Sequence, residues 1–338
     1  MSVNMQSVAQ AAGVSIMTVS RVIHQNPKVA KATRERVLAE LHQQGYRRTP
    51  FLAAWKVRVK GDIIREHPNV VFLCGYPESS IRKSPAAEIY RTVEEQAHSL
   101  GLTAGFFHAD LKSRRWSAIS KVLQARGIRG IVVGPFPEGS EPISLPWERF
   151  AVAATDYAQD LQGVNRAAQN HYSDIQRIIG RLLAGGYSRP GFVAMQGTRN
   201  TQWLGAFLER QWWLPEADKI PVFRAGTGNP IAALQRWRQS FSPDIILCPF
   251  GKALKWIDAF PSKPEAPDVF VLDLPPERSN DSERLTGMVY PAAAIGKAAV
   301  NLLAAQLRHY EQGLPSRPQT LRVEGTFQKG KSCRLGNR

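Results

Sequence analysis

The sequence predicts an α/β protein in which an N-terminal all-α helix-turn-helix headpiece precedes a core of two doubly wound parallel-sheet lobes. Three observations predict this fold. The first 45 residues hold three short helix-like runs around a Gly-Val-Ser corner at 13–15. From residue 69 onward, near-continuous apolar runs alternate with helical stretches, which is typical of parallel strands buried on both faces. A chain of 338 residues is also long enough for two or three domains.

The net charge of +16 is concentrated at the N-terminus. Residues 1–60 carry ten Lys or Arg against two acidic residues, Glu35 and Glu40. This balance favours a polyanionic partner, either a nucleic acid or an anionic membrane. A solvated basic surface is the alternative, and charge alone does not decide between them.

The three cysteines, Cys74, Cys248 and Cys333, lie far apart and form no CxxC or Cys/His cluster. Neither a disulfide framework nor a metal site is therefore expected. The sequence has no N-terminal apolar segment of the kind that directs secretion, and no apolar run approaching ~20 residues. We expect a cytoplasmic protein without a membrane span.

One segment matches a nucleotide-binding pattern, because residues 325–332 read GTFQKGKS and satisfy GxxxxGK[ST]. That pattern binds phosphate where a helix follows it, and the six residues after Ser332 are too few for such a helix. The histidines form no HxxxH pair, and no GxSxG elbow is present. We therefore expect no enzymatic activity and no cofactor.

Three helices are expected in the headpiece, over 5–11, 16–24 and 31–44. Asn4 and Ser15 are the caps of the first two, Gly13 supplies the tight corner between them, and Gly45 ends the third. The expected inward-facing residues are Val8, Ala11, Val19, Val22, Ile23, Val37, Leu38 and Leu41, and Ala9 is small enough to let another helix cross closely. Ala30, before the third helix, is a poor cap and should cost about 0.5–2 kcal/mol. Such an arrangement forms a helix-turn-helix. A small helical subdomain with incidental charge is the alternative.

The core is expected to contain at least six βα units, and this number indicates two doubly wound lobes. The expected strands are 70–76, 102–109, 130–134, 151–155, 191–195, 245–248 and 269–274, with a final strand in LRVEGTF. The expected helices are 86–100, 115–126, 168–185, 200–211, 230–240, 252–259 and 293–312.

The headpiece resembles that of the lac-repressor (LacI/GalR) family. The resemblance rests on Val8-Ala9-x-x-Ala12-Gly13-Val14-Ser15-x-x-Thr18-Val19-Ser20-Arg21-Val22. It extends to Val29-x-x-x-Thr33-Arg34-Glu35-Arg36-Val37 and to Gly45-Tyr46. It implies that the second helix enters the major groove of DNA, with contacts from Ser15, Ile16, Met17, Thr18, Ser20 and Arg21.

The chemistry of these side chains fits the implied roles. Ile16 and Met17 can touch thymine methyl groups, and Arg21 can donate twice to guanine. Ser15, Thr18 and the helix N-terminus suit phosphate oxygens. The alternatives are packing against the third helix for Met17 and a phosphate contact for Arg21.

The segment after Tyr46, RRTPFLAAWKVRVK, matches the family's hinge, a short helix that forms on operator DNA. The resemblance implies that Ala54 and Trp55 enter the minor groove, while Arg47 and Arg48 hold the DNA backbone. Two departures are Trp55, where the family's wedge is usually leucine, and Thr49, where asparagine is usual. The alternative for Trp55 is packing between the two hinge helices of a dimer.

The remainder resembles the family's periplasmic-binding-protein-like core, which binds a small effector between its lobes. The carried-over effector contacts are Asp156, Arg199, Thr201, Trp203, Phe250, Asp273 and Tyr290. Tyr290 stands where many members have glutamine, and Phe250-Gly251 replaces a common Asn-Asp pair. The alternatives are helix capping for Asp156 and Asp273, and core packing for Trp203.

The resemblance implies a headpiece at 1–47, a hinge helix or linker at 48–60, and an effector-binding and dimerisation core at 61–338. Lobe 1 is expected at about 68–158 and 288–318 and lobe 2 at about 159–287 and 319–331, with crossings near 157–162, 286–291 and 316–321. The implied function is a homodimeric repressor of a pseudo-palindromic operator, controlled by a sugar or related metabolite, with no membrane partner. A ligand-independent regulator with a degenerate pocket is the alternative. A solute-binding transport protein is disfavoured by the helix-turn-helix.

Overall fold

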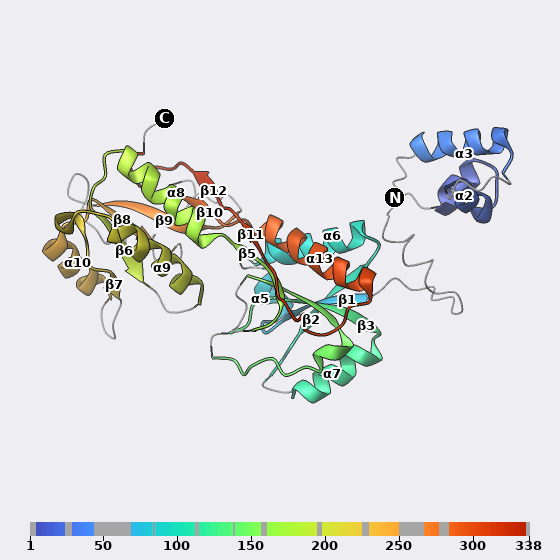
Figure 1. Ribbon diagram of the computed structural model, residues 1–338, viewed down its shortest axis with the longest axis horizontal. Helices are drawn as coiled ribbons and strands as arrows, with labels where there is room; N and C mark the ends of the chain where they lie inside the picture. Colours follow the sequence, from blue (N-terminus) through green and yellow to red (C-terminus); the bar gives the residue numbers. More distant parts are fainter. Residues whose placement is uncertain are drawn as a thin grey trace. The chain divides into compact units, whose positions relative to one another are not determined.

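The computed structural model describes residues 5–23, 29–43, 69–82, 84, 86–111, 115–137, 139–156, 161–194, 198–224, 230–249, 267–276 and 284–335. The chain divides into two compact units, Met1–Ile63 and Ile64–Arg338 (Figure 1). We call them the headpiece and the body.

The headpiece consists of α1 (Met5–Ala11), α2 (Ile16–Ile23) and α3 (Lys31–Gln43), within one residue of the expected bounds. Its small core is formed by Val8, Ala9, Ala12, Val19, Val22, Val37 and Leu41. Gly13 has a φ of +61°, which a glycine adopts without strain. Ala11 and Leu38 are exposed, so their expected inward orientation is wrong. Leu38 lies ~100° around the helix from Val37, so both cannot face the core directly.

The body holds two six-stranded sheets, and we call the layers around each sheet lobe 1 and lobe 2. Lobe 1 has the strand order β11-β5-β4-β3-β1-β2, parallel throughout. Its strands are β1 (Asn69–Cys74), β2 (Thr103–His108), β3 (Ile128–Val133), β4 (Ala151–Thr155), β5 (Asn165–Gln169) and β11 (Thr320–Val323). Its helices are α5 (Glu78–Ile81), α6 (Ala87–Ser99), α7 (Trp116–Ala125), the 3-10 turn η1 (Trp147–Arg149) and α13 (Ala292–His309).

Lobe 2 has the order β12-β10-β9-β8-β6-β7, in which β12 alone runs antiparallel to its neighbour. Its strands are β6 (Pro190–Ala194), β7 (Phe223–Arg224), β8 (Ile245–Cys248), β9 (Asp268–Leu274), β10 (Thr286–Val289) and β12 (Thr326–Gln328). Its helices are α8 (His171–Ala184), α9 (Thr198–Trp212), the 3-10 turn η2 (Glu216–Asp218) and α10 (Pro230–Phe241).

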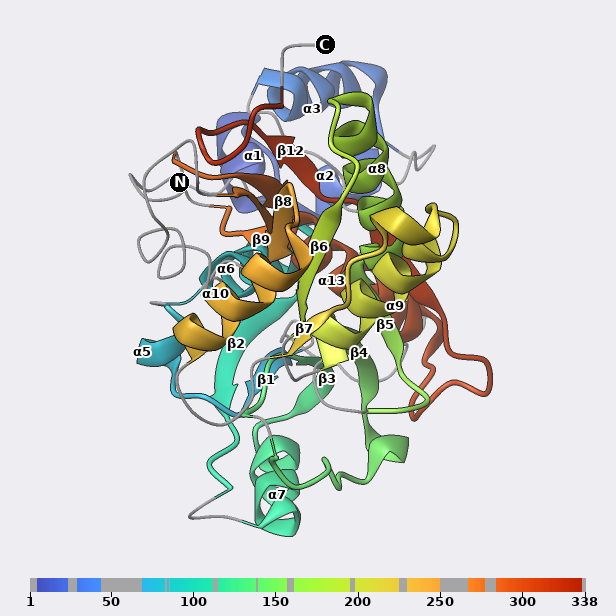
Figure 2. The ribbon, with the colours of Figure 1, turned by 90° about the vertical axis from the view of Figure 1, so that its left-hand side faces the viewer.

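Helices cover both faces of each sheet, as near-continuous apolar strands require. In lobe 1, α7 packs on the face that carries Val71 and Ile131, while α6 and α13 pack together on the other. In lobe 2, α8 and α9 lie side by side on one face and α10 on the other (Figure 2). The expected α/β fold is confirmed by these two parallel-dominated sheets.

The chain crosses between the lobes three times: from β5 to α8, from β10 to α13, and from β11 to β12. We call these the first, second and third crossings. The second lies where the sequence predicts it. The first and third lie later, because β5 and β11 belong to the sheet of lobe 1 and not to lobe 2, where we expected residues 159–287 and 319–331. The sequence NRAAQ of β5 lacks the apolar run that marks the other strands, so it was not predicted as a strand.

The expected single strand LRVEGTF is two strands, β11 and β12, which lie in different sheets on either side of Glu324 and Gly325. The GKS end of the nucleotide-like pattern has a structural role. Ser332 Oγ accepts from the Thr286 N–H (2.9 Å) and donates to the Val269 carbonyl (2.7 Å). No helix follows it among the residues described up to 335.

Candidate nucleic-acid interface and candidate effector site

The exposed surface of α2 carries the expected DNA-contacting side chains. Ile16 is 45% exposed and Met17 is 64% exposed at the start of the helix, so Met17 does not pack into the headpiece core. Arg21, one turn after Met17, places Nη2 3.6 Å from the Met17 sulfur. Met17 and Arg21 therefore share one exposed face of the helix, and Ile16 is exposed ~100° around the helix from Met17.

The N-terminus of α2 is built by Ser15 and Thr18. Ser15 Oγ accepts from the Thr18 N–H (3.2 Å) and shares a hydrogen bond with Thr18 Oγ1 (2.9 Å). The first turn of α2 contains no acidic residue. The positive end of the helix dipole therefore faces solvent without a carboxylate to neutralise it, which suits a phosphate group.

Five of the other expected DNA contacts have no described side chain. Ser20 lies in α2, and nothing is described of its side chain; Arg47, Arg48, Ala54 and Trp55 lie outside the described residues.

Two expected effector contacts bind each other in the body. Tyr290 follows β10, and its hydroxyl donates a hydrogen bond of 2.7 Å to Asp156 Oδ2. Asp156 directly follows β4 and has a φ of +53°, and its Oδ1 accepts from the Gln169 N–H (3.2 Å). Both side chains are buried, with 6% of Asp156 and 4% of Tyr290 exposed. The structure thus brings Asp156 and Tyr290 together as a hydrogen-bonded pair at the second crossing.

The remaining expected effector residues are dispersed. Trp203 is 1% exposed inside the core under α8 and α9, with its ring edge-on to His171 at 4.8 Å, so core packing describes it. Thr201 is exposed on α9, and Asp273 is half-buried near the end of β9. Arg199 lies in α9 without a described side chain, and Phe250 lies outside the described residues.

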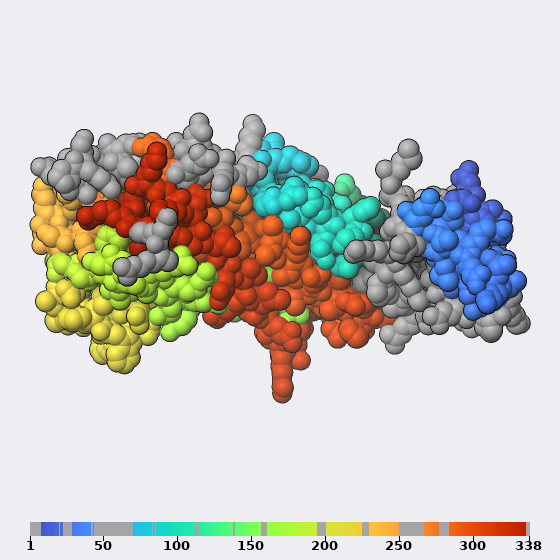
Figure 3. All heavy atoms as spheres, turned by 90° about the horizontal axis from the view of Figure 1, so that it is seen from above, coloured from blue at the N-terminus to red at the C-terminus, as the bar shows by residue number. Residues whose placement is uncertain are grey.

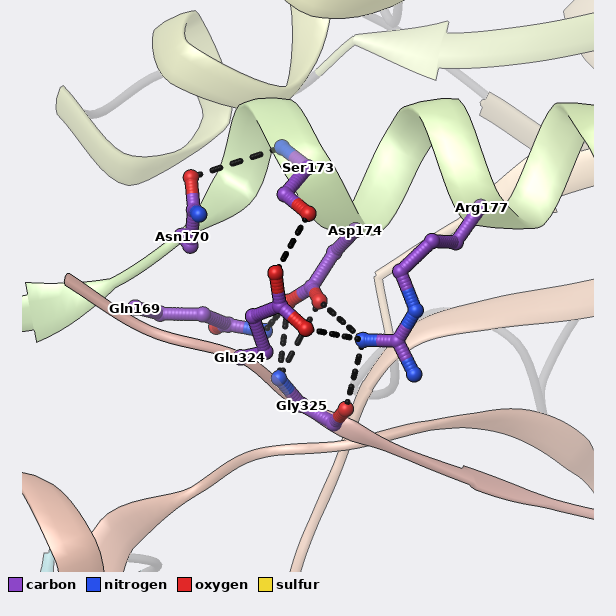
Figure 4. Close-up of polar contacts among 7 residues, drawn as sticks. All are labelled: Gln169, Asn170, Ser173, Asp174, Arg177, Glu324 and Gly325. Atoms are coloured by element: carbon purple, nitrogen blue, oxygen red, sulfur yellow. Dashed lines mark hydrogen bonds and ion pairs between the residues drawn. The ribbon is translucent and has the colours of Figure 1, made fainter.

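Sequence reasoning missed a polar cluster around the first and third crossings, shown in Figure 4. Its centre is Asp174 of α8, which is 0% exposed. Asp174 accepts from Gln169 Nε2 (2.9 Å), from the Gly325 N–H (3.1 Å to each oxygen) and from Arg177 Nη1 (3.2 Å). Burial raises the pKa of this carboxyl group, and these donors only partly oppose the rise.

Glu324 connects the cluster to the surface. Its Oε1 accepts from Ser173 Oγ (2.7 Å), and its Oε2 lies 3.3 Å from Arg177 Nη1. In Figure 3 the red C-terminal segment lies on the surface against the lime-green α8, in agreement with these contacts. An Asn-x-x-Ser-Asp stretch at a helix start is a capping signal, and Asn170 does cap α8 by accepting from the Ser173 N–H (3.4 Å). That signal does not reveal the partner segment around residue 324.

The described part of the chain contains neither a candidate metal site nor a candidate membrane-spanning helix. No group of three or more His, Cys, Asp or Glu is placed there to hold a metal ion. None of the described helices is both long and apolar enough to cross a membrane. The three cysteines are buried thiols, and burial raises the pKa of Cys74 to about 11.

The known proteins that this chain resembles are bacterial transcriptional regulators. The sequence profile "Bacterial regulatory proteins, lacI family" matches residues 4–49. The chain is 47% identical over 234 residues to the sucrose operon repressors of Shigella flexneri and Escherichia coli, covering 67% of this chain and 66% of each repressor. It therefore spans 66% of the length of these curated relatives. The family that matches residues 4–49 is the lacI family of bacterial regulatory proteins, and the relatives at 47% identity are repressors.

Solved structures share the fold over nearly the whole chain. A transcriptional regulator CelR–cellobiose complex superposes with a TM-score of 0.58 at 16% identity, covering 98% of this chain and 100% of that chain. The lac repressor dimer bound to operator and the anti-inducer ONPF gives a TM-score of 0.52 at 18% identity, covering 98% and 99%. At these identities the likeness establishes the fold.

Proposed function

We propose that this chain is a transcriptional regulator that binds operator DNA through α2 of the headpiece and releases or holds it under the control of a small ligand in the body. The DNA-binding part rests on the exposed side chains of Ile16, Met17 and Arg21. They lie on a helix whose first turn contains no acidic residue. Apolar contacts to thymine methyl groups and an arginine fork to guanine together provide direct readout in the major groove. The match of residues 4–49 to the lacI family supports the same role.

The ligand-binding part of the proposal is a sugar between the two lobes, with repression as the outcome. It is supported by the relatives named sucrose operon repressors and by the fold neighbour described with cellobiose. A homodimer on a pseudo-palindromic operator is proposed from the lac repressor dimer bound to operator. The hinge at 48–60, with Arg47 and Arg48 on the backbone and Ala54 and Trp55 in the minor groove, belongs to the proposal, as does a cytoplasmic location without enzymatic activity.

A ligand-independent regulator is the second candidate, and one observation favours it. Asp156, Tyr290 and Trp203, three of the seven residues expected to touch an effector, are engaged in contacts inside the protein. A sugar would then have to be bound by other residues, among them the expected contacts Thr201 and Asp273.

The deciding experiment selects duplexes from a random library with the purified full chain at physiological ionic strength. The selected duplex is then titrated with and without sucrose and cellobiose. Selection of one sequence class, with affinity shifted by either sugar, supports the proposal. Selection without any shift across a wider sugar panel favours the ligand-independent candidate, and failure to select any sequence overturns both.

A further inference from the structure

The three crossings between the lobes are bound to one another. The Asn170 N–H of the first crossing donates to the Val323 carbonyl at the third (2.7 Å). Gly325 of the third crossing packs against the second, since a Cβ there would lie 2.5 Å from Met288 Cγ and 3.0 Å from the Val289 carbonyl oxygen. The three crossings are therefore connected to one another, and we call them together the interlobe hinge, which is distinct from the hinge segment at 48–60.

Two buried carboxylates flank this hinge and bind the same residue. The backbone N–H of Gln169 donates to Asp156 Oδ1, while its side-chain Nε2 donates to Asp174 Oδ2. Gln169 is itself buried, with 1% exposed. Asp156 also accepts a hydrogen bond from Tyr290, and Asp174 accepts one from Gly325. A continuous chain of hydrogen bonds therefore connects all three crossings.

Two bonds in this run join groups that are anchored in different lobes. Tyr290 is held in lobe 2 because its N–H donates to the Leu274 carbonyl of β9 (2.9 Å), whereas Asp156 is held in lobe 1 because its N–H donates to the Ala167 carbonyl of β5 (2.6 Å). Gln169 is the last residue of β5 in lobe 1, and Asp174 lies in α8 of lobe 2. A change of lobe arrangement that moves these anchors relative to each other lengthens or bends the two bonds.

We infer that Gln169 and Tyr290 are positioning residues that hold the two lobes in the arrangement described, through Asp174 and Asp156 respectively. The inference rests on the proposed function for its effect on DNA, since a ligand controls DNA binding only if it favours one lobe arrangement over another. Hydrogen bonds to buried carboxylates are among the stronger polar contacts, and both acceptors here are buried. A ligand that favours another arrangement must offset them.

Lobe 2 offers a control for each bond that involves the same pair of chemical groups. The Tyr187 hydroxyl donates to the buried carboxylate of Asp268, and both groups lie within lobe 2. Gln176 Nε2 of α8 donates to Glu209 Oε2 of α9 (2.7 Å), again within lobe 2. Tyr187→Phe and Gln176→Met therefore remove the same chemical groups as Tyr290→Phe and Gln169→Met without removing a bond between lobes.

The test measures the distance between spin labels on the two lobes of the full chain by pulsed electron spin resonance. The labels are attached to Ser99→Cys on α6 and Ser240→Cys on α10, both exposed, while the native cysteines are buried. We expect Tyr290→Phe and Gln169→Met each to raise the population of a second distance about fivefold or more. Tyr187→Phe and Gln176→Met should leave the distribution of the parent chain unchanged. Circular dichroism before labelling verifies that each variant is folded.

Identical distance distributions for all four folded variants would overturn the inference. So would a redistribution as large in the two control variants as in the two hinge variants. If one hinge variant does not fold, the other decides, because each removes a different interlobe bond.

A second arm links the hinge to DNA binding. With the selected duplex, the hinge variants should change the ratio of affinities measured with and without sucrose or cellobiose, and the controls should not. A parent chain that selects no duplex overturns the proposed function, and the label distances then still decide whether the hinge bonds set the lobe arrangement.

Discussion

The hydroxyl of Tyr290 and the carboxylate of Asp156, 134 residues apart in the chain, form a buried hydrogen bond of 2.7 Å between the two lobes of the body. We expected each residue to contact an effector, yet each has its polar atom directed at the other. The bond uses Asp156 Oδ2, and the Gln169 N–H occupies Oδ1. Asp156 therefore acts on the lobe arrangement from the position where a ligand contact was expected.

The first prediction concerns direct readout of DNA by Arg21. Arg21→Ala should cost about 1–3 kcal/mol of binding free energy on the selected duplex and relax discrimination at one base pair. Fluorescence anisotropy with the selected duplex and its single-base variants measures both effects. Arg36→Ala, exposed on α3, is the control and should lower affinity for all duplexes alike. Equal losses for Arg21→Ala on selected and random duplexes would show that the side chain contacts phosphate only.

The second prediction concerns the cap of α2. Ser15→Ala removes the acceptor for the Thr18 N–H and should lower the stability of the helix by about 0.5–2 kcal/mol. Hydrogen exchange of the α2 amides, followed by mass spectrometry, reports this loss locally. Ser15→Asp keeps a capping oxygen and should preserve protection, but its negative charge should weaken DNA binding. If Ser15→Asp binds DNA as tightly as the parent chain, the helix N-terminus does not contact phosphate.

The headpiece was predictable because its determinants are local. The glycine corner, the Ser15 cap and the spacing of Val19 and Val22 all lie within a few residues of the structure that they specify. The one apolar residue placed on the wrong face of α3, Leu38, sits beside Val37, and helical spacing alone does not decide which of two adjacent residues faces the core.

The interlobe hinge was not predictable, because its determinants lie far apart in the sequence. Strand β5 is held by pairing with β4 and β11, and β11 arrives from more than 150 residues later in the chain. Its alanines and polar residues have no strand signal of their own. The same crossings bring Asp174 to Gly325 and Asp156 to Tyr290. These partners are more than 130 residues apart, so no spacing along the sequence predicts their contacts.

The third prediction compares two glycines. Gly325→Ala should destabilise the body by about 1–3 kcal/mol, since its Cβ would lie 2.5 Å from Met288 Cγ, close to the backbone of the second crossing. Gly180→Ala in α8 is the matched change at an open position, where a Cβ meets no atom within 4 Å. It should stabilise the protein by about 0.5–1 kcal/mol, because alanine is the better helix former. Urea denaturation measures both changes, and a stabilised Gly325→Ala would refute the close packing of the crossings.

The fourth prediction is a pH dependence of stability that arises from Asp174. Burial raises the pKa of this carboxyl group in the folded protein above its ordinary value of about 4. The folded state therefore binds the proton more tightly than the unfolded state. The stabilisation from protonation is fully present below the unfolded pKa and is lost as the pH rises through the raised folded pKa.

Asp174→Asn removes this titration while keeping an oxygen that can accept from the Gly325 N–H. The difference in unfolding free energy between the parent chain and Asp174→Asn, measured by urea denaturation at successive pH values, should fall as the pH rises from about 4 and then level off. Subtracting the variant cancels the titration of the other carboxylates. A difference that rises with pH would mean that the donors around Asp174, with Arg177 at 3.2 Å, outweigh its burial and lower the pKa. In that case the ionised carboxylate would contribute its full stabilisation above the unfolded pKa of about 4 and would lose it as the pH falls through the lowered folded pKa.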